Sequence, residues 1–253
     1  MSDTAPVLRI FSYLPNPRVW KAQIAAEYLG LTVEVLGDKP KHLAQWLWDY
    51  AAHHLDEAEQ QPDNPHARTG RRGFSGTLYK TDAFLQAHPF GTVPAGFSPG
   101  GGVGIFESNS ILRAVARAAP AGSLSLYGED GYAASRIDSF LDANLVFARE
   151  AQVYLLAMDA IDSATHARMA AAYEFYLAGI ESALEASAYL AGERLSIADI
   201  SFVCDFAQFL REGHYTKQLA EAGLRLISAE GLQEYPRAYA HMLTLSAQPQ
   251  FAA

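Results

Sequence analysis

The opening of the chain has the pattern of a parallel strand–helix–strand unit. Residues 7–11 form a short apolar run typical of a buried strand, and residues 32–36 alternate like a second strand. Between them, residues 18–29 carry apolar side chains at helical spacing, and Gly30 stands where a helix-ending glycine is expected. Because strands joined through a helix pair in parallel, the N-terminal part is predicted to be an α/β domain.

The pattern becomes helical only after residues 120–131. Periodic runs rich in alanine and leucine predict long helices over about 132–158, 166–188 and 197–211. The third run begins with a capping box, with Ser196 as N-cap and Asp199 as the acid three residues later. We therefore expect an α/β domain over residues 1–120, followed by an all-helical domain over residues 121–253.

Residues 41–78 look like an insertion in the α/β domain. Apolar side chains on one helical face predict an amphipathic helix over about 41–60. Residues 61–76, rich in Pro, Gly, Asn and Arg, predict an exposed loop, which is either a solvated insertion or a functional lid. The aromatic side chains of Trp46, Trp48 and Tyr50 could roof a hydrophobic pocket or make a dimer contact.

Two later turns carry residues suited to binding. Val93-Pro94 precedes one predicted strand, and Gly100-Gly101-Gly102 is typical of a hairpin turn into the next, which runs into Glu107-Ser108 before a helix. A carboxylate can pair with an ammonium group, while a hydroxyl and the free N–H groups of a helix N-terminus can bind a carboxylate. Glu107-Ser108 therefore suits the head group of an α-amino acid, although the same residues also suit an ordinary helix N-cap.

Composition narrows the classes of function. A formal net charge of −9 and a pI near 5.3 argue against a nucleic-acid-binding surface. No apolar run is long enough to cross a bilayer and the first residues lack a secretory pattern, so a cytoplasmic protein with no membrane association is expected. Cys204 is the only cysteine, and no Cys or His residues have zinc spacing, so no metal is expected.

Together these features resemble the glutathione S-transferase superfamily, over nearly the whole chain apart from about residues 41–78. The resemblance implies a thioredoxin-like α/β domain with a cis peptide bond before Pro94, followed by an all-helical bundle that contains the Ser196–Asp199 box. Four stretches are most similar to the transferase-like domain of translation elongation factor one gamma. They are residues 21–28, 103–111, 189–203 and 248–251. A bacterial β-etherase-like member of the superfamily could share this similarity.

The resemblance also implies a site for glutathione, as cosubstrate. Val93, before the cis bond to Pro94, would meet the cysteinyl part through its backbone, and Glu107 and Ser108 would hold the γ-glutamyl group. The side chains that could meet the glycine carboxylate follow the second strand: Lys39, Lys41 and His42.

The group that would ionise the glutathione thiol is left open. Alignment with the serine-type members of the family places Asn16 where the serine stands, although Asn16-Pro17 also has the pattern of a simple N-cap followed by an N1 proline. Ser12 and Tyr13 are alternative donors, and Arg18 could add positive potential or simply be solvated. A hydrogen bond to an anion contributes about 1.5–3 kcal/mol, so an amide donor could raise the acidity of a thiol about a hundredfold.

Two functions are compatible with the resemblance. The first is a homodimeric glutathione S-transferase whose thiolate attacks a small hydrophobic electrophile, expected to be aromatic, with aryl-ether cleavage as a special case. The second is a noncatalytic protein-interaction module, as in elongation factor one gamma. The paired Val93-Pro94 and Glu107-Ser108 turns favour the enzyme, whereas Asn16 in place of serine favours the module. Disulfide chemistry is disfavoured because no cysteine lies near the first helix.

Overall fold

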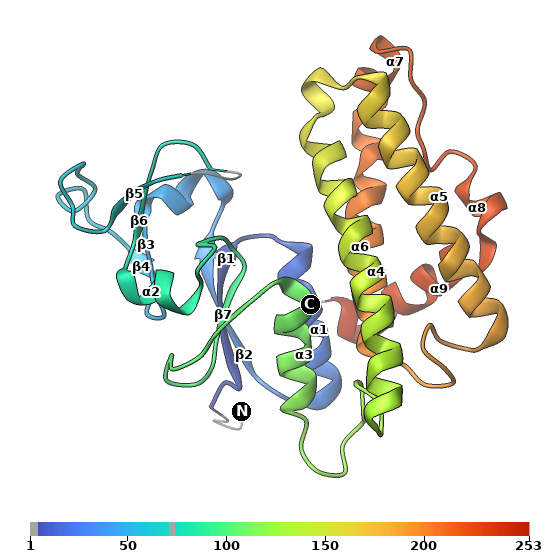
Figure 1. Ribbon diagram of the computed structural model, residues 1–253, viewed down its shortest axis with the longest axis horizontal. Helices are drawn as coiled ribbons and strands as arrows, with labels where there is room; N and C mark the ends of the chain where they lie inside the picture. The colour runs from blue at the N-terminus through green and yellow to red at the C-terminus, as the bar shows by residue number, and fades with distance from the viewer. Residues whose placement is uncertain (1–4, 71–73, 253) are drawn as a thin grey trace. The chain divides into compact units, whose positions relative to one another are not determined.

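The computed structural model describes residues 5–70 and 74–252. The chain divides into two compact units, Met1–Ser123 and Leu124–Ala253 (Figure 1). The first unit contains strands and helices, and the second contains helices with one isolated β-bridge between Tyr189 and Gly192. The predicted fold class, an α/β domain followed by an all-helical domain, is confirmed.

The main sheet of the first unit has the strand order β2-β1-β7-β8. It consists of β1 (Leu8–Tyr13), β2 (Val33–Asp38), β7 (Ala95–Phe97) and β8 (Gly104–Phe106). Strands β1 and β2 pair in parallel, as the strand–helix–strand pattern predicts, and β7 pairs antiparallel with both β1 and β8. The hairpin expected at the three glycines is therefore present between β7 and β8.

Helices α1 (Pro17–Leu29) and α3 (Ser108–Arg117) lie side by side on one face of this sheet (Figure 1). Gly96 in β7 faces α3, because a Cβ added there would lie 3.1 Å from the Ile111 side chain. Side chains alternate along a strand, so Ala95 and Phe97 face the opposite side. The main sheet therefore has two covered faces.

The insertion forms a second sheet with the order β4-β3-β6-β5. Its elements are η1 (Pro40–Gln45), β3 (Trp46–Trp48), β4 (His53–His54), β5 (Ala67–Thr69) and β6 (Thr77–Lys80), followed by α2 (Asp82–Ala87). The amphipathic helix predicted over about 41–60 is therefore wrong. The predicted loop over 61–76 contains β5, which pairs with β6, while residues 71–73 lie outside the described residues.

The helical prediction for the insertion failed because it selected the wrong buried face. The apolar face of the predicted helix consisted of Leu43, Trp46, Leu47, Tyr50, Ala51, His54 and Ala58. Trp48 was not part of it, yet Trp48 is 0% exposed and its indole donates a hydrogen bond to the Leu43 carbonyl over 2.9 Å. Trp48 belongs to a core shared with the main sheet, whose buried members are Phe11, Leu43, Trp48, Ala52, Leu78, Phe84, Ala95 and Phe97. The insertion is thus packed on the sheet face opposite α1 and α3, and Trp48 cannot roof a pocket.

The second unit is built on three long helices, as predicted. These are α4 (Gly131–Leu156), α5 (Ser163–Ala186) and α6 (Ile197–Phe209), and α4 packs against both of the others. Helix α9 (Pro236–Ser246) packs against α5 and α6. The remaining short elements are η2 (Met158–Ala160), η3 (Leu210–Tyr215), α7 (Thr216–Glu221), α8 (Gly231–Glu234) and η4 (Pro249–Ala252).

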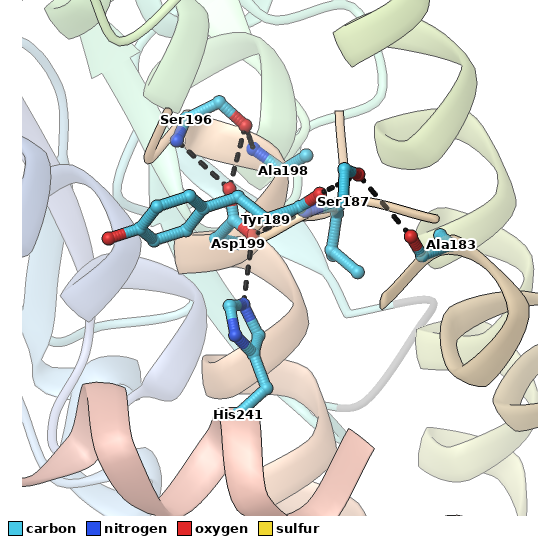
Figure 2. Close-up of polar contacts among 8 residues, drawn as sticks. Ala183, Ser187, Tyr189, Ser196, Ala198, Asp199 and His241 are labelled. Carbon is cyan, nitrogen blue, oxygen red and sulfur yellow. Dashed lines mark hydrogen bonds and ion pairs between the residues drawn. The ribbon is translucent and has the colours of Figure 1, made fainter. Parts of the chain in front are cut away.

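The predicted capping box at the start of α6 is present and extends beyond that helix (Figure 2). Asp199 is buried, and its carboxylate accepts hydrogen bonds from the Ser196 backbone and hydroxyl groups, both at 2.9 Å. It also accepts from the Leu190 N–H and contacts His241 Nε2 on α9, both at 2.9 Å. One carboxylate therefore joins the α6 N-terminus to the preceding turn and to α9.

In the described part of the chain, none of the helices combines the length and apolar character that a membrane span requires. Within the same residues, no three His, Cys, Asp or Glu side chains are grouped so that they could hold a metal ion.

Candidate functional site

The predicted site residues of the first unit meet at one edge of the main sheet. Phe11 pairs with Ala95, and Ala95 pairs with Phe106. Continuing this register by one residue brings Ser12, Pro94 and Glu107 to the same edge, where β1 ends and where α1 and α3 begin. Ligands of open α/β sheets bind outside the carboxyl ends of the strands, so this edge is the candidate site.

The peptide bond between Val93 and Pro94 is cis, as the resemblance implies. Val93 is half-buried and Pro94 is buried, immediately before β7. The bond between Leu14 and Pro15 is also cis, a feature that sequence analysis did not anticipate.

Glu107 precedes α3 with a backbone conformation that non-glycine residues rarely adopt, φ 66° and ψ 126°. Among the described residues it is the only non-glycine residue with a positive φ. Such conformations cost about 1–3 kcal/mol and cluster at functional sites. The Glu107 side chain is exposed and makes no capping hydrogen bond. The ordinary N-cap alternative therefore does not account for this glutamate.

Ser108 is the first residue of α3 and is buried, as is Asn109. Both side chains contact Lys21 on α1, whose ammonium donates hydrogen bonds to Ser108 Oγ at 3.3 Å and to Asn109 Oδ1 at 2.9 Å. Lys21 is only 1% exposed. A positive charge thus lies beside the hydroxyl and the helix N-terminus that were predicted to meet a carboxylate.

Sequence analysis missed Lys21 as a site residue. The available signal was the position of Lys21 on the same helical face as Pro17 and Ala25, a face of α1 that is buried. Such a lysine commonly extends its charged end to solvent, so the sequence alone did not mark it. Only the pairing of α1 with α3 shows where the ammonium lies.

Asn16 and Ser12 form a buried pair at the start of α1. Asn16 is the N-cap, because its side-chain oxygen accepts a hydrogen bond from the Arg18 N–H over 3.0 Å. Its Nδ2 group donates to Ser12 Oγ over 3.0 Å, and both residues are 0% exposed. Tyr13 and Arg18 are half-buried. The three candidate thiol donors therefore differ in access, and of these three only Tyr13 keeps exposed surface.

The candidates for a glycine carboxylate follow β2 at this same edge, since Asp38 pairs with Tyr13. Lys39 and Lys41 are exposed. His42 is half-buried, and its Nδ1 lies 3.3 Å from Asp38 Oδ1. The Lys39 N–H also donates to Asp38 over 2.6 Å, and this hydrogen bond is the main reason that the pKa of Asp38 is lowered.

His88 packs against β8, the strand that leads to Glu107. Its ring stacks on Phe106 with a centroid distance of 4.9 Å, and its Nε2 lies 3.3 Å from Thr92 Oγ1. Burial, with a smaller contribution from the charge of Lys80, lowers the pKa of His88 to about 4. The imidazole is therefore neutral at physiological pH and supports the turn by packing.

Comparison with known proteins gives three further findings. Residues 160–249 match the family model of the glutathione S-transferase C-terminal domain. Elongation factor 1-gamma of Carassius auratus is 26% identical over 248 residues, and that of Homo sapiens is 28% identical over 249 residues. Each alignment covers 96% of this chain but 45% of the relative, so the chain spans about half the length of these curated relatives.

Solved structures share the fold at low sequence identity. A glutathione S-transferase from Methylobacillus flagellatus with bound glutathione has a TM-score of 0.64 and 16% identity, covering 97% of each chain. A glutathione transferase from Phanerochaete chrysosporium with oxidised glutathione has a TM-score of 0.66 and 15% identity, covering 98% of this chain and 93% of that chain.

The two units and the arrangement of β-strands and helices define a protein with the glutathione S-transferase fold. The match of the helical unit and the similarity to elongation factor 1-gamma agree with that assignment. The chain thus has the fold of the glutathione S-transferases, and its helical unit matches the C-terminal domain of that family.

Proposed function

We propose that this protein is a glutathione S-transferase that binds glutathione at the edge of its main sheet. The observation that carries the proposal is the exposed Glu107 carboxylate, held in a strained backbone conformation next to Ser108 and the buried Lys21 ammonium. A helix cap alone requires none of these three features. The glutathione S-transferase from Methylobacillus flagellatus, which shares the fold and has glutathione bound, supports the proposal.

The γ-glutamyl head group carries an ammonium group and a carboxylate, and this turn offers a partner for each. Its ammonium group would pair with the Glu107 carboxylate. Its carboxylate would accept hydrogen bonds from Ser108 Oγ and from the free N–H groups at the start of α3, with the charge of Lys21 close behind. Val93, beside Pro94 on the neighbouring strand, would meet the cysteinyl backbone.

The cysteine sulfur would then lie toward the end of β1. At that end of β1, Asn16 donates a hydrogen bond to Ser12 Oγ. Because Ser12 and Asn16 are both fully buried, we assign direct contact with the sulfur to Tyr13 and long-range positive potential to Arg18. The thiolate would attack a small hydrophobic electrophile, with aromatic compounds and aryl ethers as the substrates to screen.

We further propose a cytoplasmic homodimer. Phe90 is 72% exposed although it packs edge-on against Phe106, with ring centroids 5.4 Å apart. An exposed aromatic ring beside a rigid turn is a common anchor at protein interfaces. Sedimentation velocity should give a dimer for the unmodified protein and a monomer for Phe90→Ser, whereas an unchanged dimer would remove Phe90 from the interface.

The alternative function is a noncatalytic interaction module. It is favoured by the similarity to elongation factor 1-gamma and by the complete burial of Asn16 and Ser12, which keeps two candidate donors away from solvent. In this case glutathione would bind without becoming ionised, or would not bind.

Isothermal titration with glutathione tests the proposal, with Ser110→Ala as the matched control for Ser108→Ala. Ser110 lies two residues further along α3 and is half-buried. We expect binding to the unmodified protein and to Ser110→Ala, and about tenfold weaker binding to Ser108→Ala. A thiolate absorbance band in the complex, with turnover of chlorodinitrobenzene or an aryl ether, would favour the enzyme. Binding without that band would favour the module.

A further inference from the structure

A hollow in the helical unit is lined by none of the residues of the sheet-edge site. Its volume is about 560 Å³, and it lies between α5, the segment at residues 223–230 and α8. Its wall includes two tyrosines and three glutamates. Tyr173 and Tyr235 supply aromatic surface, and Glu174, Glu230 and Glu234 supply carboxylates.

The tyrosines of this wall contact other aromatic side chains. Tyr173 is only 3% exposed, and its hydroxyl is hydrogen-bonded to that of Tyr239 over 3.0 Å. The Tyr235 ring stands nearly perpendicular to the Tyr173 ring, with centroids 5.7 Å apart and an interplanar angle of 81°. The two rings therefore pack edge to face, and Tyr235, which keeps some exposed surface, is the ring that a cation in the hollow could contact.

The charged part of the wall is strongly acidic. Glu174, Glu230 and Glu234 are exposed, and none of the ion pairs among the described residues includes them. Arg225 is the one arginine in the wall, so the carboxylates exceed it by two. Burial raises the pKa of Tyr235, and the charges of Glu234 and Glu174 raise it further. These two carboxylates therefore act on the same tyrosine hydroxyl.

We propose that this pocket binds a small organic cation, a free alkylammonium or quaternary ammonium compound. Its charged head would lie against the Tyr235 ring, which Tyr173 supports from within the unit, with Glu174 and Glu234 neutralising the charge. The excess of carboxylates disfavours an anion, and an uncharged apolar compound would gain nothing from three glutamates. This site does not depend on the glutathione site, and either can exist without the other.

Titration with choline tests the proposal, with dimethylbutanol as the uncharged isostere of the same shape. We expect one saturable choline site in the full chain, at least tenfold weaker binding of dimethylbutanol, and weaker choline binding at high salt. Glu174→Gln and Glu234→Gln should each weaken choline binding about threefold to tenfold. The matched control is Glu193→Gln, an exposed glutamate of the same unit outside the pocket wall, which should leave it unchanged.

Variants of Tyr235 separate the aromatic face from the hydroxyl. Tyr235→Phe keeps the ring and should bind choline within about twofold of the unmodified protein, whereas Tyr235→Ala should lose most of the affinity. Circular dichroism would verify that each variant is folded. Absence of saturable choline binding, equal binding of dimethylbutanol, or equal losses for Tyr235→Phe and Tyr235→Ala would each overturn the proposal.

Discussion

The Lys21 ammonium on α1 donates a hydrogen bond to the amide oxygen of Asn109 on α3 over 2.9 Å, in the interior of the first unit. The two residues are 88 positions apart in sequence. Their contact joins α1, the helix that connects β1 to β2, to α3, the helix that follows Glu107. The contact places the Lys21 ammonium at the N-terminal end of α3, where the carboxylate of a ligand would lie. This contact links the packing of α1 and α3 directly to the proposed chemistry.

Replacement of Lys21 by methionine should therefore weaken both binding and folding. Loss of the charge should raise the Kd for glutathione about tenfold, or about 1.4 kcal/mol. Ser108 and Asn109 would lose a buried donor, which should lower the free energy of unfolding by about 1–3 kcal/mol. Calorimetry and urea unfolding measure the two effects. Lys217→Met is the control, since Lys217 is exposed and belongs to the helical unit; equal glutathione affinity in both variants would contradict the assigned role of Lys21.

Replacement of Glu107 should separate backbone strain from ligand binding. Glu107→Ala keeps a Cβ in a strained conformation, whereas Glu107→Gly removes it, so the glycine variant should be more stable by about 1 kcal/mol. Both variants lack the carboxylate and should bind glutathione equally weakly. Urea unfolding of the pair measures the difference, and a less stable glycine variant would show that the positive φ of Glu107 is not strained.

Protonation of His88 should destabilise the first unit in mild acid. Burial lowers its pKa from the usual 6.5 to about 4 in the folded state, so the unfolded chain binds more protons between these values. The free energy of unfolding should consequently fall as the pH falls from about 6.5 to 4, by about 3 kcal/mol in total. His88→Phe retains an aromatic ring against Phe106 and should lose this part of the pH dependence. If His88→Phe showed the same pH dependence of unfolding as the unmodified protein, groups other than His88 would be responsible for it.

Removal of the Asp199 carboxylate should destabilise the helical unit far more than loss of the N-cap hydroxyl. Asp199 is buried and serves the Leu190 N–H, two groups of Ser196 and His241, so Asp199→Ala should cost about 3–5 kcal/mol (Figure 2). Ser196→Ala should cost about 1–2 kcal/mol. Thermal unfolding compares them, and similar losses would mean that Asp199 acts only through the capping box.

Much of the fold could be predicted because its signals are local. The first crossover, the hairpin glycines and the Ser196–Asp199 box each depend on neighbouring residues, and all three are present in the structure. The insertion could not be predicted in this way. Trp48 and Lys80 are brought together by a parallel pairing of β3 with β6, more than thirty residues apart, which overrides the helical spacing of the local sequence.

Residues of the candidate site could be selected from the sequence where they stand at a recognisable turn, and could not where their position depends on packing. Glu107 and Ser108 could be selected because they stand at a predicted strand-to-helix turn. Lys21 could not, because its position depends on the contact between α1 and α3. Burial of Asn16 is likewise a tertiary property, and it changes which donor can reach a thiol.

A double-mutant cycle between protein and ligand tests the central claim most directly. Glu107→Gln and the unmodified protein would each be titrated with glutathione and with the analogue that lacks the γ-glutamyl amino group. If the Glu107 carboxylate pairs with that ammonium, the two changes should be coupled by about 1 kcal/mol or more. Additive losses, or equal binding of both ligands by the unmodified protein, would contradict the assignment of this turn as the γ-glutamyl site.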